Sequence, residues 1–511
     1  MRSKKALYNL ISNLLLQAII IISGFIVPRI IISSFGSEVN GLVSSITQFL
    51  AYITLLESGF GPVIKAALYK PIANKDSTTI GNILKSSEKI FRVIALIFLG
   101  YIVILCAFYP FIVNNQFDWL FTSSLIVIIG ISTFAEYYFG MTFGLFLQAK
   151  QRKYVISFIQ IITYILSTIA IIVLARIRVG IHIIKLVSGA IFIIRPLFLN
   201  IYVKRKFNLD LKNCAKDYKL NKKWDGLAQH VAYVIHTKTD VTVLTLFTTL
   251  SEVSVYSVYH LVVSGVKALI GTFSGSLDAT FGDMIAKSEE KNLNEKFSVF
   301  ETIFNTVSTI AFSTAIVLIT PFISVYTRGI TDVDYIRPLF GVLLVISEYI
   351  WAVRQPYNVI ILAAGHFKET RKGAWVECIS NIVISIILVN WLGIIGVAIG
   401  TIVAMAIRAI EFIYHANKYI LRRSIWKSGK KIALIVLETA IIVAISSMVQ
   451  FRENNNYLDF GINLASTMCV ASIITLTINS IFFGKELNGA IRLFSKALLK
   501  RKSKRKIDER G

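Results

Sequence analysis

The sequence predicts an all-α polytopic membrane protein with about fourteen transmembrane helices. Three observations predict this class: a high apolar content, long apolar runs, and basic residues placed between those runs. Of the 511 residues 55% are hydrophobic, and the mean hydropathy is +0.67, which is typical of many-span membrane proteins. Only 16% of the residues are charged, yet the formal net charge is +25. Because Lys and Arg lie between the apolar runs, we expect them to face anionic membrane lipids and not nucleic acid.

Each predicted span is an apolar run of about 20 residues, the length that crosses about 30 Å of hydrocarbon. The first run is too long for a signal peptide and no small-residue cleavage site follows it, so we expect a retained span. The eleventh and twelfth runs lie so close together that "NWLGIIG" must form a very tight turn. The fourteen spans are expected near residues 9–33, 40–64, 90–113, 119–147, 155–175, 181–203, 227–249, 252–283, 298–320, 337–363, 373–391, 393–417, 431–450 and 459–483.

The basic residues also predict the orientation of the chain. With the N-terminus inside, the cytoplasmic segments hold 42 of the 54 Lys and Arg residues, whereas the outer loops hold five. Both termini are therefore expected in the cytoplasm, and the tail "KRKSKRK" is interpreted as a solvated segment beside the membrane. No loop is long enough for a soluble domain, so any chemistry is expected inside or between helices.

Two short matches indicate an internal repeat. The first outer hairpin reads "SSFGSEVNGL" and the hairpin after the seventh span reads "FTTLSEVSVY", so Ser-Glu-Val recurs at an offset of 214 residues. Ile-Ala recurs at nearly the same offset near the cytoplasmic ends of the second and eighth spans. Spans one and seven run in the same direction, so the repeat would be parallel, with six helices in each half. We expect lobes at residues 1–210 and 211–425, and two additional helices with the basic tail at 426–511.

The seventh span, "YVIHTKTDVTVL", carries three ionisable residues at about the middle of the membrane. His236 and Asp240 fall on one polar stripe, whereas Lys238 lies on the opposite side of the helix beside Thr242 and Thr245. A helix that is polar on two faces is expected between an aqueous cavity and a neighbouring helix, and not against lipid.

Other charged residues also fall within predicted spans, where they usually face a cavity or a partner. The cations Arg29, Lys267 and Arg354 are candidates for contact with an anionic ligand, and the repeat aligns Arg29 within one helical turn of Asp240. Interhelical ion pairs are the alternative for each of them. For Arg408 and Glu411, three residues apart, the structural pair is favoured.

Several kinds of chemistry have no motif here. The four cysteines are widely scattered without a C-x-x-C, so they are interpreted as packing residues and not as metal ligands or disulfides. The chain contains no H-E-x-x-H, P-loop, nucleophile elbow or dinucleotide-binding loop. We therefore expect no cofactor, no metal and no enzymatic activity.

The first two spans resemble those of Wzx-type polysaccharide flippases. The shared features are an Arg before the short "FG-x-E-x-NGL" hairpin, the Glu-x-Gly-x-Gly of "ESGFG", and "ALYKP" at the first cytoplasmic loop. In the seventh and eighth spans, "TDVTVL" followed by "SEVSVYSVY" is similar to another part of that family. The topology is similar over essentially the whole chain.

This resemblance implies membership of the MATE-like (MOP) exporter superfamily, with two six-helix lobes forming a V around a central cavity. It implies that undecaprenyl-pyrophosphate-linked oligosaccharide crosses the bacterial cytoplasmic membrane by alternating access, alongside a polysaccharide polymerase and chain-length machinery. Pyrophosphate requires cations, so the cavity residues would be Arg29, Lys238, Lys267 and Arg354. Asp240 and His236 would couple transport to H⁺ or Na⁺.

Alternatives remain open at this point. A cation-coupled MATE-type drug exporter and a flippase for the peptidoglycan lipid precursor belong to the same superfamily. A drug exporter for organic cations is expected to have an acidic, aromatic cavity, whereas the buried charges here are no less basic than acidic. A membrane polymerase would need a sizeable catalytic outer loop, and a scaffold would leave Arg29 and Asp240 without a role.

Overall fold

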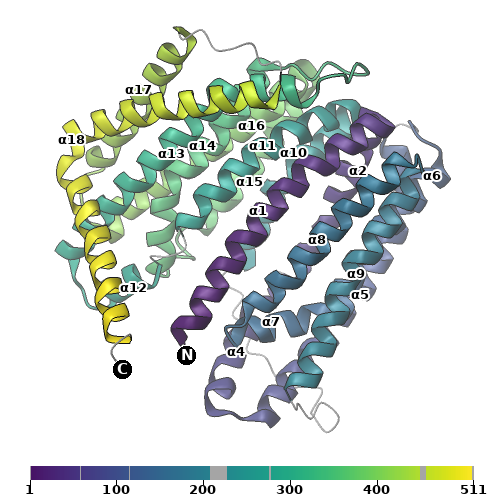
Figure 1. Cartoon of the computed structure of the whole chain (residues 1–511), viewed down its shortest axis with the longest axis horizontal. Helices are drawn as coiled ribbons and strands as arrows, with labels where there is room; N and C mark the ends of the chain where they lie inside the picture. Colours follow the sequence, from purple (N-terminus) through teal and green to yellow (C-terminus); the bar gives the residue numbers. More distant parts are fainter. Residues whose placement is uncertain are drawn as a thin grey trace. The chain divides into compact units, whose positions relative to one another are not determined.

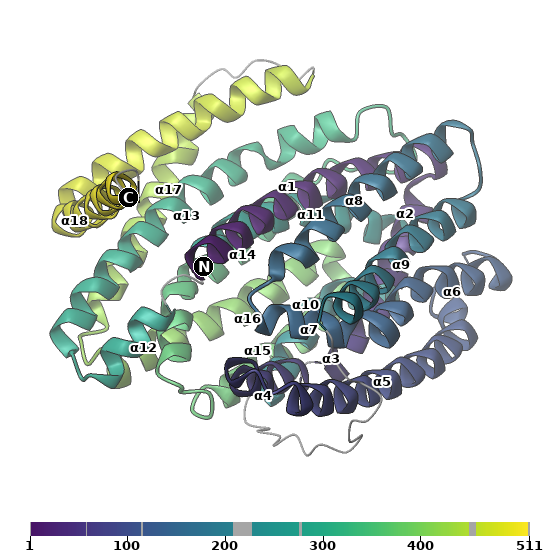
Figure 2. The ribbon, with the colours of Figure 1, turned by 60° about the horizontal axis from the view of Figure 1, so that its bottom comes forward.

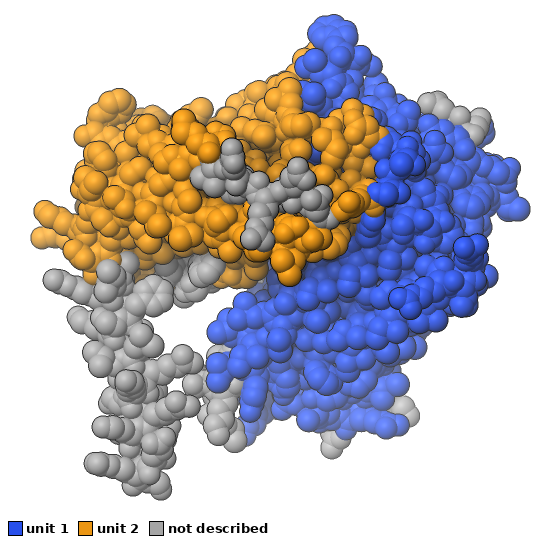
Figure 3. Space-filling view, turned by 45° about the horizontal axis from the view of Figure 1, so that its top comes forward, with its two compact units in different colours: residues 1–261, 329–333, 389–397 blue, residues 262–328, 334–388, 398–511 orange. Residues whose placement is uncertain are grey.

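The computed structural model describes residues 2–57, 59–113, 116–207, 227–274, 278–448 and 456–508. Every regular element within those ranges is a helix, which confirms the predicted all-α class (Figures 1 and 2). By their internal contacts these residues form two compact units, coloured separately in Figure 3. Unit 1 comprises residues 1–261, 329–333 and 389–397, and unit 2 comprises 262–328, 334–388 and 398–511. The lobe boundaries predicted at residues 210 and 425 stay a prediction.

The helices of the first half follow one another with short connections. They are α1 (Arg2–Phe35), α2 (Ser37–Leu50), the 3₁₀ turn η1 (Ala51–Ile53), α3 (Thr54–Glu57), α4 (Gly61–Asn74), α5 (Ser77–Ile112), α6 (Trp119–Ala135), the π-helix η2 (Glu136–Gly140), α7 (Met141–Ala149), α8 (Lys153–Arg176) and α9 (Ile181–Lys206). The predicted span at 40–64 is present as Ser37–Glu57, but it ends earlier than predicted, because α4 restarts at Gly61 with Pro62 in its first turn. Proline favours a helix start, where its missing N–H costs nothing.

The second half continues with longer helices. They are α10 (Leu227–Phe247), α11 (Leu250–Ser274), α12 (Asp278–Ala286), α13 (Glu290–Tyr326), α14 (Pro338–Ala363), α15 (Arg371–Leu392), α16 (Ile394–His415), the π-helix η4 (Ala416–Ile420), α17 (Trp426–Met448) and α18 (Tyr457–Asp508). The predicted tight turn is confirmed, since Gly393 alone links α15 to α16 with φ +56°. An L-residue rarely adopts that φ, which explains the glycine.

Twelve helices in the described part of the chain are long and apolar enough to cross a membrane, so the chain is a multi-pass membrane protein. The other two predicted spans, at 227–249 and 337–363, are present as α10 and α14 but are less apolar than those twelve. Both helices carry ionisable side chains, which lower their hydropathy. These two helices therefore depend on protein neighbours more than the others do.

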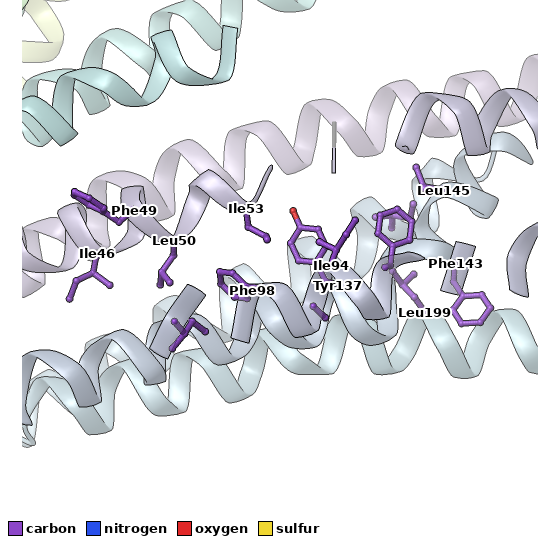
Figure 4. Close-up of a cluster of buried hydrophobic side chains, with 14 of the residues drawn as sticks. Ile46, Phe49, Leu50, Ile53, Ile94, Phe98, Tyr137, Phe143, Leu145 and Leu199 are labelled. Atoms are coloured by element: carbon purple, nitrogen blue, oxygen red, sulfur yellow. The ribbon is translucent and has the colours of Figure 1, made fainter. Parts of the chain in front are cut away.

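Unit 1 has a hydrophobic core built from α2, α5, α7 and α9 (Figure 4). Ile46 and Leu50 of α2 and Phe98 of α5 are each at most 3% exposed. Tyr137 of η2 belongs to the same cluster, and its hydroxyl donates a hydrogen bond of 2.7 Å to Glu57 Oε2. The core therefore fixes α2, the helix that carries the polar contacts of the site described below.

Contacts inside unit 1 support the predicted repeat. Asn40 Nδ2 donates a 2.8 Å hydrogen bond to Ser254 Oγ, and these two positions are separated by the repeat offset of 214 residues. In a pseudo-twofold arrangement, equivalent positions near the axis contact one another. Gly41 also approaches α11 closely, because a Cβ there would lie 1.8 Å from the carbonyl oxygen of Leu250.

Candidate functional site

The Lys238 face of α10 packs on α2 and on the η1 turn that follows it, to which Tyr52 belongs. The hydroxyls of Tyr52 and Thr242 are 2.8 Å apart, and those of Ser45 and Thr245 are 2.6 Å apart. Lys238 Nζ donates to Gln48 Oε1 at 3.3 Å. The sequence predicted a neighbouring helix on one polar face of α10 without saying which face, and the structure places that contact on the Lys238 face. We refer to the two hydroxyl pairs and the Lys238–Gln48 pair as the α2–α10 seam.

The opposite face of α10 carries His236 and Asp240. Both side chains are buried, at 4% and 8% exposure, although the sequence favoured an aqueous lining there. Asp240 Oδ2 accepts a 2.8 Å hydrogen bond from the Tyr256 hydroxyl, and the Tyr256 ring stacks on His260 at 5.6 Å. Asp240 is therefore held by the first turns of α11, within unit 1.

Arg29 lies near the C-terminal end of α1 and is half-buried. Two groups of Ser37, in the hairpin that follows, are held by a carboxylate: its amide and its hydroxyl donate to Asp332 at 2.6 and 2.9 Å. Asp332 thus caps the N-terminus of α2 from a distant part of the sequence, where Gly36 takes φ +87°. The capped turn fixes the register of α1 relative to α2, and with it the position of Arg29.

In unit 2, Lys267 of α11 faces α14. Its ammonium group lies 2.7 Å from Glu348 Oε2 and 4.7 Å from the centre of the Trp351 ring. The Lys267 side chain keeps 20% exposure and that of Glu348 keeps 10%. A half-buried cation with one carboxylate and one aromatic face can still accept a further anion.

Arg354 lies in a more enclosed group on α14, α15 and α16. Its Nη1 is 2.6 Å from Glu377 Oε1, and Arg408 Nε lies 3.5 Å from the other oxygen of that carboxylate. Arg408 also pairs with Glu411, as the i,i+3 spacing predicted. Two cations and two carboxylates balance one another here, so the contacts of Arg354 favour a structural role.

The sequence-predicted residues therefore fall into separate groups. Arg29, Lys238, Asp240 and His236 belong to unit 1, and Lys267 and Arg354 belong to unit 2. Within unit 1, Lys238 and Asp240 point to different neighbours, namely α2 and α11. Within unit 2, Lys267 and Arg354 bind different carboxylates.

Sequence reasoning missed a buried charge group on α13. Glu301 is 0% exposed and accepts from Lys431 Nζ at 2.7 Å, from Arg423 Nη2 at 3.1 Å and from the Tyr357 hydroxyl. Lys431 and Arg423 fall in the predicted cytoplasmic segment 417–431, so the sequence offers no reason to pair them with a buried acid. The available signal was Glu301 itself, an acid near the end of an apolar run.

A second group was only partly recognised. Arg195 Nη2 lies 3.1 Å from Glu136 Oε1, and Glu136 opens the π-helix η2. Glu136 and Arg195 fall within the predicted spans 119–147 and 181–203, but the sequence did not predict that they pair. The π-helix widens the turn at Gly140, where a Cβ would lie 2.7 Å from Pro196 Cβ.

Taken together, the helices and the internal charges define a class of protein, namely a multi-pass helical membrane protein with charged groups buried between its helices. No protein-family model matches the chain and no curated protein matches it by sequence. Among solved structures, it is similar to the lipid II flippase MurJ in an inward closed conformation. That match has a TM-score of 0.67 at 17% identity, and it covers 94% of this chain and 99% of MurJ.

Two transporters are also similar. An inward-facing multidrug resistance MATE family transporter matches with a TM-score of 0.62 at 14% identity, covering 80% of this chain and 95% of the transporter. A MOP superfamily transporter from Pyrococcus furiosus matches with a TM-score of 0.53 at 10% identity, covering 80% and 96%. At these identities the likeness establishes the fold.

Proposed function

We propose that this chain is a flippase that moves undecaprenyl-pyrophosphate-linked oligosaccharide from the inner to the outer leaflet of the bacterial cytoplasmic membrane. The observation that carries the proposal is the extent of the structural likeness. The match to a lipid II flippase includes 94% of the chain, whereas the matches to transporters with TM-scores above 0.5 include 80–85%. A flippase for a lipid-linked sugar therefore accounts for more of the chain than a drug exporter does.

The buried cations suit the head group of such a substrate. Pyrophosphate is anionic, so its passage through the membrane requires cations that are not fully neutralised. Of the four proposed residues, Arg29 and Lys267 are half-buried. Lys238 donates to the neutral Gln48 side chain, and within the described residues its ammonium group has no carboxylate partner. Arg354 is 5% exposed and bound to Glu377, so we assign it the weakest part in binding the substrate.

Asp240 and His236 are proposed as the residues that couple transport to H⁺ or Na⁺. A carboxylate at membrane depth that accepts a hydrogen bond from a tyrosine hydroxyl can exchange that bond for a cation or a proton. His236 lies one helical turn earlier on the same face of α10, so a charge change on either residue acts on the other. Both termini would lie in the cytoplasm, and the polymerase and chain-length machinery would take up the product outside.

Reconstitution tests the function directly. The purified protein is placed in liposomes with a fluorescent undecaprenyl-pyrophosphate oligosaccharide, and transfer between leaflets is measured by access of a membrane-impermeant quencher. We expect Arg29→Ala to reduce the transfer rate at least tenfold, and the exposed Arg176→Ala to leave it unchanged. Equal rates for wild type, Arg29→Ala and protein-free liposomes would contradict the proposal.

A flippase for the peptidoglycan lipid precursor is the second candidate, because the match to MurJ favours it directly. Both substrates share the polyisoprenyl pyrophosphate and differ in the sugar. Expression in cells depleted of their lipid II flippase separates them. Restored growth would favour the precursor, whereas restored surface polysaccharide in a strain that lacks its oligosaccharide flippase would favour the first proposal.

A further inference from the structure

A polar pocket lies within unit 2, between α13, α17 and α18. The predicted repeat leaves α17 and α18 outside the two lobes. Helices α17 and α18 run along α13 (Figures 1 and 2). The pocket has an empty volume of about 230 Å³. It lies where α18 departs from helical geometry, since Phe483 takes φ −130° and ψ 33°. Its lining consists of Thr302, Asn305, Thr306, Lys431, Leu434, Ile435, Glu438, Asn479 and Phe483.

Glu438 is the unusual member of this lining. The residue is 1% exposed, and its Oε1 is a buried atom to which no described residue donates a hydrogen bond. Asn305 of α13, which is 7% exposed, also has a buried side-chain oxygen without a donor in the described chain. Two acceptors without donors thus line one pocket, which indicates that the pocket binds a group able to donate hydrogen bonds or positive charge.

The protonation of Glu438 follows from the charges around it. An ionised carboxylate buried without a partner costs several kcal/mol, so burial alone favours the neutral acid. Lys431 lines the same pocket, but its ammonium group already contacts Glu301 at 2.7 Å and Thr302 Oγ1 at 2.9 Å. Lys431 and Arg423 together face the carboxylate of Glu301, and Glu486 of α18 also faces Lys431, with its Oε1 3.4 Å from the Ser298 hydroxyl that Lys431 contacts at 3.3 Å. The charges of this group balance without Glu438, so the effect that favours an ionised Glu438 is the ammonium group of Lys431 in the same pocket.

Two opposing effects therefore act on the Glu438 carboxyl group: burial favours its neutral form, and the nearby Lys431 ammonium group favours its ionised form. The charged or titratable groups that face it are Lys431 on its own helix, Glu301 on α13 and Tyr349 on α14. Tyr349 lies 2.7 Å from Thr309 Oγ1 and 3.4 Å from Thr439 Oγ1, beside Glu438. On α18 the lining residues are the neutral Asn479 and Phe483.

We propose that Glu438 is a proton-binding residue, and that the pocket between α13, α17 and α18 is a proton site of this protein. The neutral acid releases its proton to a water molecule, and the hydroxyls of Thr302 and Thr306 and the two asparagine amides can hydrogen-bond the hydronium ion that forms. The carboxylate takes a proton back from hydronium in the same way, which releases water. A metal ion suits the pocket less, because the ammonium group of Lys431 lines it.

Infrared difference spectroscopy of the purified full-length protein tests the site. Spectra are recorded between acid and alkaline buffers in wild type, Glu438→Gln and the exposed control Glu290→Gln. We expect a protonated-carboxyl band from a buried group in wild type and in the control, and its complete loss in Glu438→Gln. If the spectrum of Glu438→Gln keeps this band, the proposal is overturned.

Two further measurements keep the result unambiguous. The glutamine of Glu438→Gln has the shape of the protonated acid. We therefore expect the unfolding midpoint of this variant to match that of wild type at neutral pH. A large loss of stability would contradict a site that holds a proton. Replacing choline chloride by sodium chloride at equal ionic strength should leave the infrared titration unchanged. If sodium changes the proton concentration at the midpoint of the infrared titration tenfold, the pocket binds sodium instead of a proton.

Whether this proton drives transport rests on the proposed function. In proteoliposomes with a pH gradient, Glu438→Gln should lose the stimulation by the gradient and keep the transfer rate seen without one. If wild type transfers no lipid-linked substrate, the proposed function fails while the infrared titration still decides the proton site. If Glu438→Gln keeps the full stimulation, Glu438 binds a proton that is not coupled to transfer.

Discussion

At the scale of single residues, buried charges are bound by partners on other helices. Glu301 accepts from Lys431, Arg423 and Tyr357, and Glu377 lies between Arg354 and Arg408. In an apolar surrounding each such pair offsets the cost of dehydrating its members only if its geometry is good. Removing one member leaves the others uncompensated, which is more costly than removing the whole group.

We expect Glu301→Gln to lower the free energy of unfolding by about 3–5 kcal/mol, because two cations would then be buried without a carboxylate. Denaturant unfolding of the detergent-solubilised protein measures this loss. Glu290→Gln is the matched control: its pair with Arg422 is exposed on both sides, and exposed pairs contribute about 0–1 kcal/mol. Equal stability of the two variants would show that the Glu301 group contributes no more than a surface pair.

Gly41 gives a second expectation at this scale. A Cβ at this position would overlap the carbonyl oxygen of Leu250, which is backbone and cannot turn aside. Overpacking of this kind costs about 1–3 kcal/mol, so Gly41→Ala should lower the thermal unfolding midpoint. Gly144→Ala is the control, since nothing lies within 4 Å of its added methyl group. An unchanged midpoint in Gly41→Ala would mean that α2 and α11 are not in close contact.

At the scale of helices, the α2–α10 seam explains how a helix as polar as α10 is accommodated. The hydroxyls of α10 bond to the α10 backbone and also to residues of α2 and η1. For example, Thr242 Oγ1 donates to the Lys238 carbonyl at 2.9 Å and lies 2.8 Å from the hydroxyl of Tyr52 in η1. Such interhelical bonds are modest individually in membrane proteins. Several along one face fix the register of the two helices.

A double-mutant cycle on Tyr52→Phe and Thr242→Val should give a coupling energy of about 0.6 kcal/mol, the average for interhelical hydrogen bonds in a membrane. The cycle is measured by unfolding in detergent micelles. As a control, Tyr52→Phe is combined with Thr248→Val, whose hydroxyl bonds only within its own chain segment, to Leu244 and Thr249. A coupling that is equal in both cycles would argue against a specific seam.

The sequence could predict most of the helices but few of their contacts. Apolar runs give the spans directly, and an i,i+3 spacing predicts the Arg408–Glu411 pair because both residues lie on one helix. The Arg354–Glu377 pair joins two helices, and their relative register depends on packing that periodicity does not encode. For the same reason Lys238 could be placed on the correct face of α10, while its partner Gln48 could not be named.

At the scale of the whole molecule, the distribution of Lys and Arg determines how the chain is expected to lie in the membrane. Basic residues are retained on the cytoplasmic side during insertion, so a strong excess on one side fixes the orientation. In this chain the predicted cytoplasmic segments hold 42 of the 54 Lys and Arg residues. The connection between α12 and α13 is then expected inside, and the connection between α13 and α14 outside.

Single cysteines introduced into a variant without the native cysteines test this orientation in intact cells. Thr331→Cys lies in the exposed connection between α13 and α14, and Lys287→Cys lies at the exposed end of α12. A membrane-impermeant maleimide should label Thr331→Cys in intact cells, and should label Lys287→Cys only after the cells are opened. The two positions are separated by a single crossing of α13, so they must respond oppositely if α13 spans the membrane. The reverse pattern would invert the orientation and, with it, the direction of transfer proposed for the substrate, whereas labelling of both in intact cells would mean that α13 does not cross.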